Sequence, residues 1–277
     1  MSHRIILAAL EQAAAGDAQH AVQAWRVHTT STAARLVLGY ALLCVMLDAR
    51  TDRAARRQGV AMMLRELEHH APPEPWEGPP LVPDEVLHHL LERLRALDLS
   101  TEPLLRWCVP VEPPQREVAA AAGLGAGGML PGFDRAMLLL TIARCEQPPL
   151  LEPLREAFRI AVQDPLPFVR WCLLADIAVI IRPWEGVRAQ RMMQGIMDEL
   201  AAWADPDDRD TFGSALLPDV QVVLGTGVSI TLAARVADPF LAVSGLLRLA
   251  HQMGEAGHGR DQRSCLAHAV MRLLNAG

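Results

Sequence analysis

The sequence predicts an all-α protein, and three observations support this fold class. Only 4% of the 277 residues are aromatic, fewer than the core of a β-sandwich or β-barrel usually contains. Residues with high helix propensity, chiefly Ala, Leu, Arg, Glu, Gln and Met, dominate instead. Apolar residues also recur at helical spacing, as at Ile5, Ile6, Ala9 and Leu10. Because 51% of the residues are hydrophobic, the chain can bury a core, which excludes wholesale disorder.

Four helices are expected before residue 70. The first ends at Gly16-Asp17, and the polar run from His28 to Thr32 offers N-cap residues for the third. The turns between the helices are short, so neighbouring helices should run antiparallel. We expect the second, third and fourth helices at about 17–27, 33–47 and 52–70.

A proline-rich segment at 71–83 follows this first group of helices. It contains six prolines, each of which removes a backbone donor and clashes with the preceding helical turn. We interpret it as a semi-rigid linker or a surface excursion. The predicted organisation is therefore N-terminal helical repeats at 1–70, the proline-rich segment at 71–83, and further helical repeats at 84–277.

The remainder of the chain is also predicted to be helical, with a glycine-rich loop at 123–132 that follows a short Ala-rich helix. From Gly213 onward the periodicity is weaker, and the apolar run interrupted at 224–227 could also form a strand. The expected helices lie at about 84–97, 103–109, 133–145, 150–163, 166–181, 187–204, 236–253 and 264–274.

The chain contains an internal repeat. Residues 91–110 align without gaps with residues 155–174, a shift of 64, and the triplet Arg-Trp-Cys coincides in the two segments. A shift of 135 places Arg35 on Arg170. Self-similarity of this kind is typical of proteins built from stacked helix pairs.

Residues 154–180 resemble a HEAT-type repeat. The segment combines an amphipathic first helix, an Asp-Pro turn at Asp164 and a second helix that opens with Val169-Arg170. The resemblance implies that Asp164 caps the second helix and that Arg170 bridges neighbouring repeats. The segment GDAQHAVQAW, which starts at Gly16, is equally similar to a tetratricopeptide unit.

Both of these families are α-solenoids, in which each helix pair buries its apolar face against the next pair. The resemblance therefore implies a right-handed α-solenoid of stacked antiparallel helix pairs that becomes irregular toward the C-terminal end. At roughly 35 to 45 residues per pair, the chain would hold about six or seven pairs. A helical bundle with irregular pairing is the alternative.

Two Glu-x-x-His spacings flank the proline-rich segment, at Glu66–His69 and Glu85–His88. Residues three apart on a helix share a face, so each carboxylate and imidazole could bind one metal ion. A di-iron site would need two more glutamates, and we find none at convincing positions in buried stripes. The alternative is that these side chains support one another on solvated helix ends. Further candidate ligands are His70, His89 and Glu92 beside them, and a C-terminal group of His251, His258, Cys265 and His268 whose spacing matches no zinc framework.

The sequence gives little support to catalysis of other kinds. The run GLGAGG at 123–128 follows a predicted helix, whereas a dinucleotide-binding turn follows a strand. No G-x-S-x-G motif supplies a serine nucleophile. Four of the five cysteines fall in apolar stretches, where a free Cys behaves as a small hydrophobe. The sequence therefore favours a non-enzymatic protein that needs no cofactor.

The dipeptide Arg-Trp occurs at equivalent repeat positions, Arg106-Trp107 and Arg170-Trp171, and Arg35 occupies the third such position. Arg and Trp are enriched at binding hot spots, so these five residues could line a groove that holds a peptide or an acidic motif. In the alternative interpretation, the arginines form a ladder between repeats and the tryptophans belong to the core.

Charge and targeting signals restrict the class of protein further. The net charge is -6, and all 26 basic residues are arginines interleaved with acidic residues, which argues against a nucleic-acid partner. No apolar run reaches the length of a membrane span, and the N-terminus turns polar too soon for a signal peptide. Five scattered cysteines favour a reducing compartment. We therefore expect a cytoplasmic protein.

These observations lead to two hypotheses about function. The first is an adaptor, scaffold or chaperone of a bacterial cytoplasmic system that binds a protein or peptide in a helical groove. The net acidic charge favours basic partners over acidic ones. The second is a metal-dependent enzyme or metalloprotein that uses the Glu/His cluster around the proline-rich segment.

Overall fold

The computed structural model describes residues 3–28, 31–72, 82–107, 131–144 and 151–276. Of these residues 83% are helical, and none of them lies in a strand, so the predicted all-α class is confirmed. No helix in these ranges is both long enough and apolar enough to cross a membrane. Most of the proline-rich segment, the Ala-rich helix and most of the glycine-rich loop lie outside the described residues.

The chain divides into two compact units. Unit 1 consists of residues 1–113 and 238–277, and unit 2 consists of residues 114–237. Unit 1 is therefore discontinuous in sequence, because its last two helices come from the C-terminal end of the chain. Its helices are α1 (His3–Ala14), α2 (Ala18–His28), α3 (Thr32–Asp48), α4 (Arg53–His69), α5 (Asp84–Ala96), α6 (Glu102–Leu105), α15 (Pro239–Glu255) and α16 (Gly259–Ala276).

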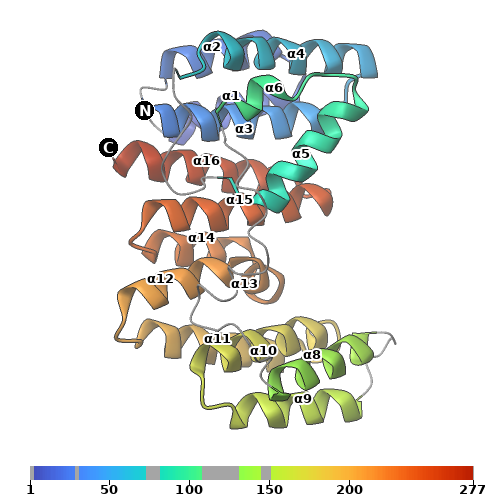
Figure 1. Ribbon diagram of the computed structural model, residues 1–277, viewed down its shortest axis with the longest axis vertical. Helices are drawn as coiled ribbons and strands as arrows, with labels where there is room; N and C mark the ends of the chain where they lie inside the picture. The colour runs from blue at the N-terminus through green and yellow to red at the C-terminus, as the bar shows by residue number, and fades with distance from the viewer. Residues whose placement is uncertain (1–2, 29–30, 73–81, 108–130, 145–150, 277) are drawn as a thin grey trace. The chain divides into compact units, whose positions relative to one another are not determined.

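Helix α3 forms the centre of unit 1. It is apolar on every side, and thirteen of its residues are buried. A helix of this kind must be surrounded by other helices, and α3 contacts α1, α2, α4 and α16 (Figure 1). The Ser31 side chain caps its N-terminus by accepting a hydrogen bond of 3.2 Å from the Ala34 amide.

Two buried tryptophans extend this core. The Trp25 indole N–H donates to the Arg35 carbonyl at 2.8 Å, and the Trp107 indole N–H donates to the Leu67 carbonyl at 2.8 Å. The two rings meet edge to face with centroids 6.3 Å apart. Each tryptophan therefore fills core volume and also satisfies its one polar atom, which keeps the burial favourable.

Unit 2 is built around α10. Eight residues of α10 are buried, and this helix contacts α8, α9, α11 and α13. Trp171 on α10 packs edge to face against Trp203 and Phe212, with ring centroids 5.5 and 6.0 Å away. The helices of this unit are α8 (Pro131–Arg144), α9 (Leu151–Gln163), α10 (Pro167–Ile181), α11 (Gly186–Ala201), α12 (Pro206–Ala215), α13 (Leu217–Leu224) and α14 (Thr226–Arg235).

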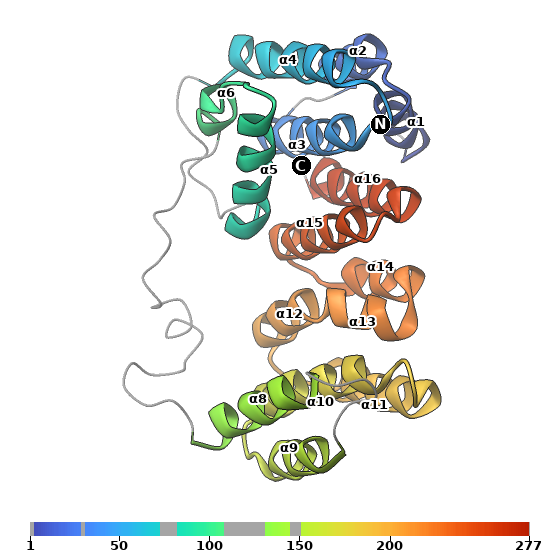
Figure 2. The same ribbon diagram turned by 90° about the vertical axis from the view of Figure 1, so that its right-hand side faces the viewer.

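Helices that follow one another in sequence pack together in both units, as α1 with α2, α3 with α4, α8 with α9, α10 with α11, α13 with α14 and α15 with α16. This packing is compatible with a helical repeat fold. Figure 2 shows the pairing clearly for α15 and α16, and it also shows α5 running across the direction of α3 and α15.

The structure departs from the sequence-based expectations in two places. The apolar run after Gly213 is entirely helical: Gly225, with φ of +96°, separates α13 from α14 because it adopts a backbone conformation that other residues avoid. Of the helix expected at 103–109, the described part is helical at Glu102–Leu105 and forms a turn at Arg106 and Trp107, whereas 108–109 lie outside the described residues. A four-residue helix is sufficient here because Leu104 and Trp107 already reach the core.

A paired glycine experiment tests the packing of α3. A Cβ atom added at Gly39 would lie 2.9 Å from Leu67 Cδ2 and 3.3 Å from Trp25 Nε1, whereas one added at Gly195 of α11 would have no neighbour within 4 Å. We expect Gly39→Ala to lower the free energy of unfolding by about 1–2 kcal/mol, because overpacking outweighs the gain in helix propensity. Gly195→Ala should raise it by about 0.5–1 kcal/mol. Urea unfolding of both variants measures the difference, and equal effects would contradict the close approach of α3 to its neighbours.

Candidate functional site

The two Arg-Trp dipeptides occupy different units and have different local partners. In unit 1, Trp107 is buried and Arg106 is half-exposed. The Arg106 guanidinium lies 2.8 Å from the Glu102 carboxylate and 3.9 Å from that of Glu68. The hydrogen bond from Arg106 to Glu102 raises the pKa of this guanidinium further above its usual range. Arg106 therefore joins α6 to α4 on the surface of the unit.

The second dipeptide holds one carboxylate of its own unit. The Arg170 guanidinium and the Trp171 indole N–H both donate to Oε2 of Glu199, at 2.9 and 2.8 Å. These two hydrogen bonds, that of Trp171 first, hold the pKa of Glu199 below its usual range. Trp171 is buried and Arg170 is about one-quarter exposed. The dipeptide thus ties α10 to α11.

The third equivalent position, Arg35, lies partly buried on α3 of unit 1, where its carbonyl accepts the Trp25 hydrogen bond. Because Trp107 and Trp171 are enclosed by core residues, neither offers surface to a partner in this structure. Partner binding by Arg35, Arg106 and Arg170 stays a prediction. The contacts that Arg106 and Arg170 make are ion pairs within their own units, from Arg106 to Glu102 and Glu68 and from Arg170 to Glu199.

The Asp-Pro turn before α10 differs in one detail from the geometry that the HEAT resemblance implies. Asp164 accepts a hydrogen bond of 2.9 Å from the Leu166 amide, so it organises the turn that leads into α10. The N-cap residue itself is Leu166, whose side chain makes no capping hydrogen bond. Asp164 therefore shapes the approach to the helix without capping it.

The three described side chains of the metal hypothesis, those of Glu66, His69 and His88, do not converge in this structure. Glu66 binds the Arg26 guanidinium at 2.6 Å, and this hydrogen bond lowers the pKa of Glu66. His69 is exposed on α4, and His88 lies 3.2 Å from Glu92 on α5. The backbone of Glu85 is part of α5, and its side chain lies outside what the structure describes. Among the described side chains, Glu66, His69 and His88 share no common point at which an ion could bind.

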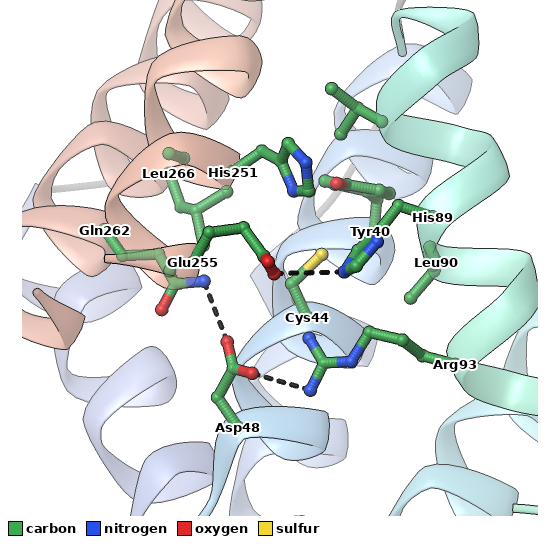
Figure 3. A pocket seen from close by; sticks show the side chains of 13 residues that line it. Tyr40, Cys44, Asp48, His89, Leu90, Arg93, His251, Glu255, Gln262 and Leu266 are labelled. Atoms are coloured by element: carbon green, nitrogen blue, oxygen red, sulfur yellow. Dashed lines mark hydrogen bonds and ion pairs between the residues drawn. The ribbon is translucent and has the colours of Figure 1, made fainter. Parts of the chain in front are cut away.

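A different set of ligands gathers in a pocket of unit 1 (Figure 3). His89 of α5 faces His251 and Glu255 of α15, and one ligand atom of each residue lies within 4.8 Å of the other two. The His89 Nε2 atom is 3.1 Å from a carboxylate oxygen of Glu255. The rings of His89 and His251 have centroids 4.7 Å apart. This is the one cluster of three or more potential metal ligands among the described residues.

The far side of the same pocket is a closed polar network. The Asp48 carboxylate accepts hydrogen bonds from the Arg93 guanidinium at 2.6 Å and from the Gln262 side-chain amide at 2.9 Å. It therefore connects α3 with α5 and α16 (Figure 3). Because both of its oxygens are occupied, Asp48 compensates the Arg93 charge and orients two side chains of the pocket wall.

The pocket does not have the properties of a catalytic site. Burial raises the pKa of the Cys44 thiol to about 12, so this thiol is protonated at neutral pH and is a poor nucleophile. Burial likewise raises the pKa of Tyr40 well above its usual value. The cavity has a volume of about 20 Å³. This space is sufficient for a water molecule or a single ion.

Unit 2 offers a larger, apolar groove. Its walls come from α9, α10 and the start of α11, and its volume is about 240 Å³. Trp184 and Val187 lie at the neighbouring turn and are 48% and 64% exposed, which is unusual for large apolar side chains. We call this surface the apolar groove; its lining residues are Leu151, Leu154, Arg155, Phe158, Ile177, Ile181, Glu185, Arg188 and Met192.

The sequence analysis identified only two of the three residues in the unit 1 cluster as candidate ligands. His89 and His251 were candidates in two separate groups, and Glu255 was not among the candidates. The spacing of His251 and Glu255, four residues apart on one helix, is a signal that could have identified the pair. Nothing local in the sequence indicates that α5 lies beside α15, because this contact depends on the tertiary fold.

Comparisons with protein-family models, with curated proteins and with solved structures give no significant match for this chain.

Unit 2 also contains a half-buried carboxylate, that of Asp219, with a shifted pKa. Burial, reinforced by the nearby Asp176 carboxylate, raises the pKa of Asp219 from 3.8 to about 6. Asp176 itself is paired with Arg144 at 2.5 Å. Because the folded-state pKa of Asp219 is the higher one, protonation favours the folded state. This contribution is complete below pH 3.8 and is lost as the pH rises through about 6.

We therefore expect Asp219→Asn to stabilise the chain at pH 8 by about 1–3 kcal/mol and to give no such gain at pH 4, since a neutral amide carries no ionisation cost. Urea unfolding of the native and variant chains between pH 4 and pH 8 measures this difference. Asp198→Asn, at an exposed aspartate of the same unit, is the control and should show a flat difference. A gain at pH 8 that persists unchanged at pH 4 would contradict the raised pKa.

Proposed function

We propose that this protein is a non-enzymatic adaptor that binds a peptide segment of another protein in the apolar groove of unit 2. The observation that carries this proposal is the combination of an open apolar groove with large exposed hydrophobic side chains at its edge. Exposed apolar surface of this kind is costly in water and marks interaction sites in soluble proteins. A groove between helices suits an amphipathic helix or an extended peptide with apolar anchors.

The charged rim of the groove supports recognition of carboxylates. Arg155 pairs with Glu152 at 2.8 Å, and Arg188 pairs with Glu185 at 3.0 Å. All four side chains are largely exposed, and exposed pairs of this kind contribute little to stability. A carboxylate of the partner can therefore replace Glu152 or Glu185 at small cost. Apolar anchors would supply the affinity, and the arginines would fix the register.

The finer fold assignment belongs to the same proposal. We assign the chain to the α-solenoids, as a right-handed stack of helix pairs of HEAT type or, less favoured, of tetratricopeptide type. The Asp164 turn and the link from Arg170 through Glu199 to α11 support the HEAT type. We also propose a chaperone or assembly role in the bacterial cytoplasm, by analogy with the functions that such folds often serve.

The alternative, a metalloprotein that uses Glu66, His69, Glu85 and His88, has less support. Glu66 is committed to Arg26, and His88 is paired with Glu92. The arrangement of unit 1 favours a different and smaller ligand set for a metal ion, which does not require catalysis.

Groove variants test the adaptor proposal. We expect the full chain to enrich peptides with two or more apolar residues and an acidic residue from a displayed random library. Their affinity, measured by fluorescence anisotropy, should fall about 5- to 30-fold in Leu151→Ser, because truncating a hot-spot anchor costs about 1–2 kcal/mol. Leu151 lines the groove and is 58% exposed, so the fold should persist.

Val162→Ser is the matched control. Val162 is 52% exposed on α9 but does not line the groove, so peptide affinity should not change. Failure to enrich any peptide, or an equal loss of affinity in the control, would refute binding at the groove.

A further inference from the structure

The His89–His251–Glu255 cluster has the donor set and the spacing of a divalent metal site. Two imidazole nitrogens and one carboxylate oxygen are ligands that Zn²⁺ binds in proteins, with a water molecule as the fourth ligand. In a tetrahedral site with bonds of about 2.0–2.2 Å, ligand atoms lie about 3.3 Å apart. His89 Nε2 and Glu255 Oε1 are already 3.1 Å apart, and the largest separation among the three ligand atoms is within 4.8 Å.

A second observation points to a missing ligand at this position. The His89 Nε2 atom is buried and has no hydrogen bond of acceptable geometry, even though Glu255 is close to it. Leaving a buried polar atom unsatisfied costs free energy, and native proteins rarely do so without a reason. An ion bound by both His89 and Glu255 would give this nitrogen a ligand bond. That bond would replace the poorly aligned contact between the nitrogen and the Glu255 carboxylate.

The surroundings restrict the ion and its role. The cavity of about 20 Å³ has room for a single ion, and the Glu255 side chain is 58% exposed, so solvent can reach the ion and supply the fourth ligand. The other charged pair of the pocket, Asp48 and Arg93, is 2.6 Å apart and neutralises itself, so the Glu255 carboxylate would supply the negative charge beside the ion. The Cys44 thiol is not part of this ligand group, so the protein donors are nitrogen and oxygen atoms.

The position of the ligands in the fold indicates what the ion would do. His251 and Glu255 lie one helical turn apart on α15, whereas His89 lies on α5, which follows the proline-rich segment. Among the described helices, α5 makes its most extensive helix–helix contact with α15, and it runs across that helix (Figure 2). A bond network through one ion would fasten these two helices, which are far apart in sequence.

We propose that His89, His251 and Glu255 bind one divalent transition-metal ion, with zinc as the preferred ion, and that this ion is a structural clip between α5 and α15. The clip is independent of the apolar groove, which lies in unit 2. Its function is to stabilise unit 1, since an ion that binds the folded state and not the unfolded chain raises the free energy of unfolding.

Equilibrium dialysis of the untagged full chain, stripped of metal with EDTA, tests this proposal with Zn²⁺ as the probe. We expect one equivalent of Zn²⁺ to bind at pH 7.5 and the melting temperature to rise until that equivalent is filled. His89→Asn, His251→Asn and Glu255→Gln should each weaken binding at least 10-fold. His88→Asn, at the exposed neighbour of His89, and His69→Asn are the matched controls and should bind as the native chain does.

A second measurement covers the case in which a ligand variant unfolds. Co²⁺ substituted into the native chain should give the intense visible absorption of a tetrahedral ion, and Glu255→Gln should shift or abolish it while circular dichroism of the metal-free variant reports its helix content. Absence of stoichiometric Zn²⁺ binding by the native chain would overturn the proposal. Loss of binding in His69→Asn or His88→Asn with retention in His251→Asn would overturn it as well and would favour the ligand set around the proline-rich segment.

Discussion

The need to cover α3 on all sides determines the architecture of unit 1. A helix that is apolar around its whole circumference cannot lie on a surface, and α1, α2 and α4 leave part of α3 uncovered. The chain supplies the missing cover from its far end, where α16 packs against both α3 and α1. The position of α16 in turn places α15, and α15 places His251 and Glu255 opposite His89. The candidate metal site is thus a consequence of how one apolar helix is buried.

Helix α10 is likewise apolar and must be covered by other helices, but in unit 2 the covering helices come from one continuous segment. It is enclosed by α8, α9, α11 and α13, all of which belong to the same continuous stretch of chain. Toward the end of α10, the buried Ile177 and Ile181 line the apolar groove together with Leu151 of α9, which is 58% exposed. In unit 1 a distant segment closes the core, whereas in unit 2 part of the apolar surface remains open to solvent. This difference is the reason for placing the partner-binding function in unit 2.

The features that follow from local physics were predictable from the sequence. The all-α class and most of the helix boundaries follow from periodicity and from capping residues such as Ser31 and Asp205, whose side chains accept hydrogen bonds from the first turns of α3 and α12. Both tryptophans of the repeated Arg-Trp dipeptide are buried, although Trp107 follows the short helix α6 and Trp171 lies within α10. The dipeptide could not indicate their partners, because Trp107 donates to a carbonyl of the preceding α4 and Trp171 to a carboxylate of the following α11. The division into units, and the meeting of His89 with Glu255, depend on contacts between residues more than 150 positions apart, which no local pattern encodes.

The discontinuity of unit 1 has a consequence for synthesis on the ribosome. Domains generally fold as units and in the order in which they emerge, with synthesis adding about 5–20 residues per second. Residues 114–237 emerge as one uninterrupted stretch and can fold before synthesis of the chain ends. The first helices of unit 1 emerge before unit 2, but unit 1 can complete its fold only after unit 2 has emerged, because α3 is not fully covered until α16 has been synthesised. During that interval part of the apolar surface of α3 stays uncovered, so unit 1 is exposed to aggregation with other nascent chains until α16 has been synthesised.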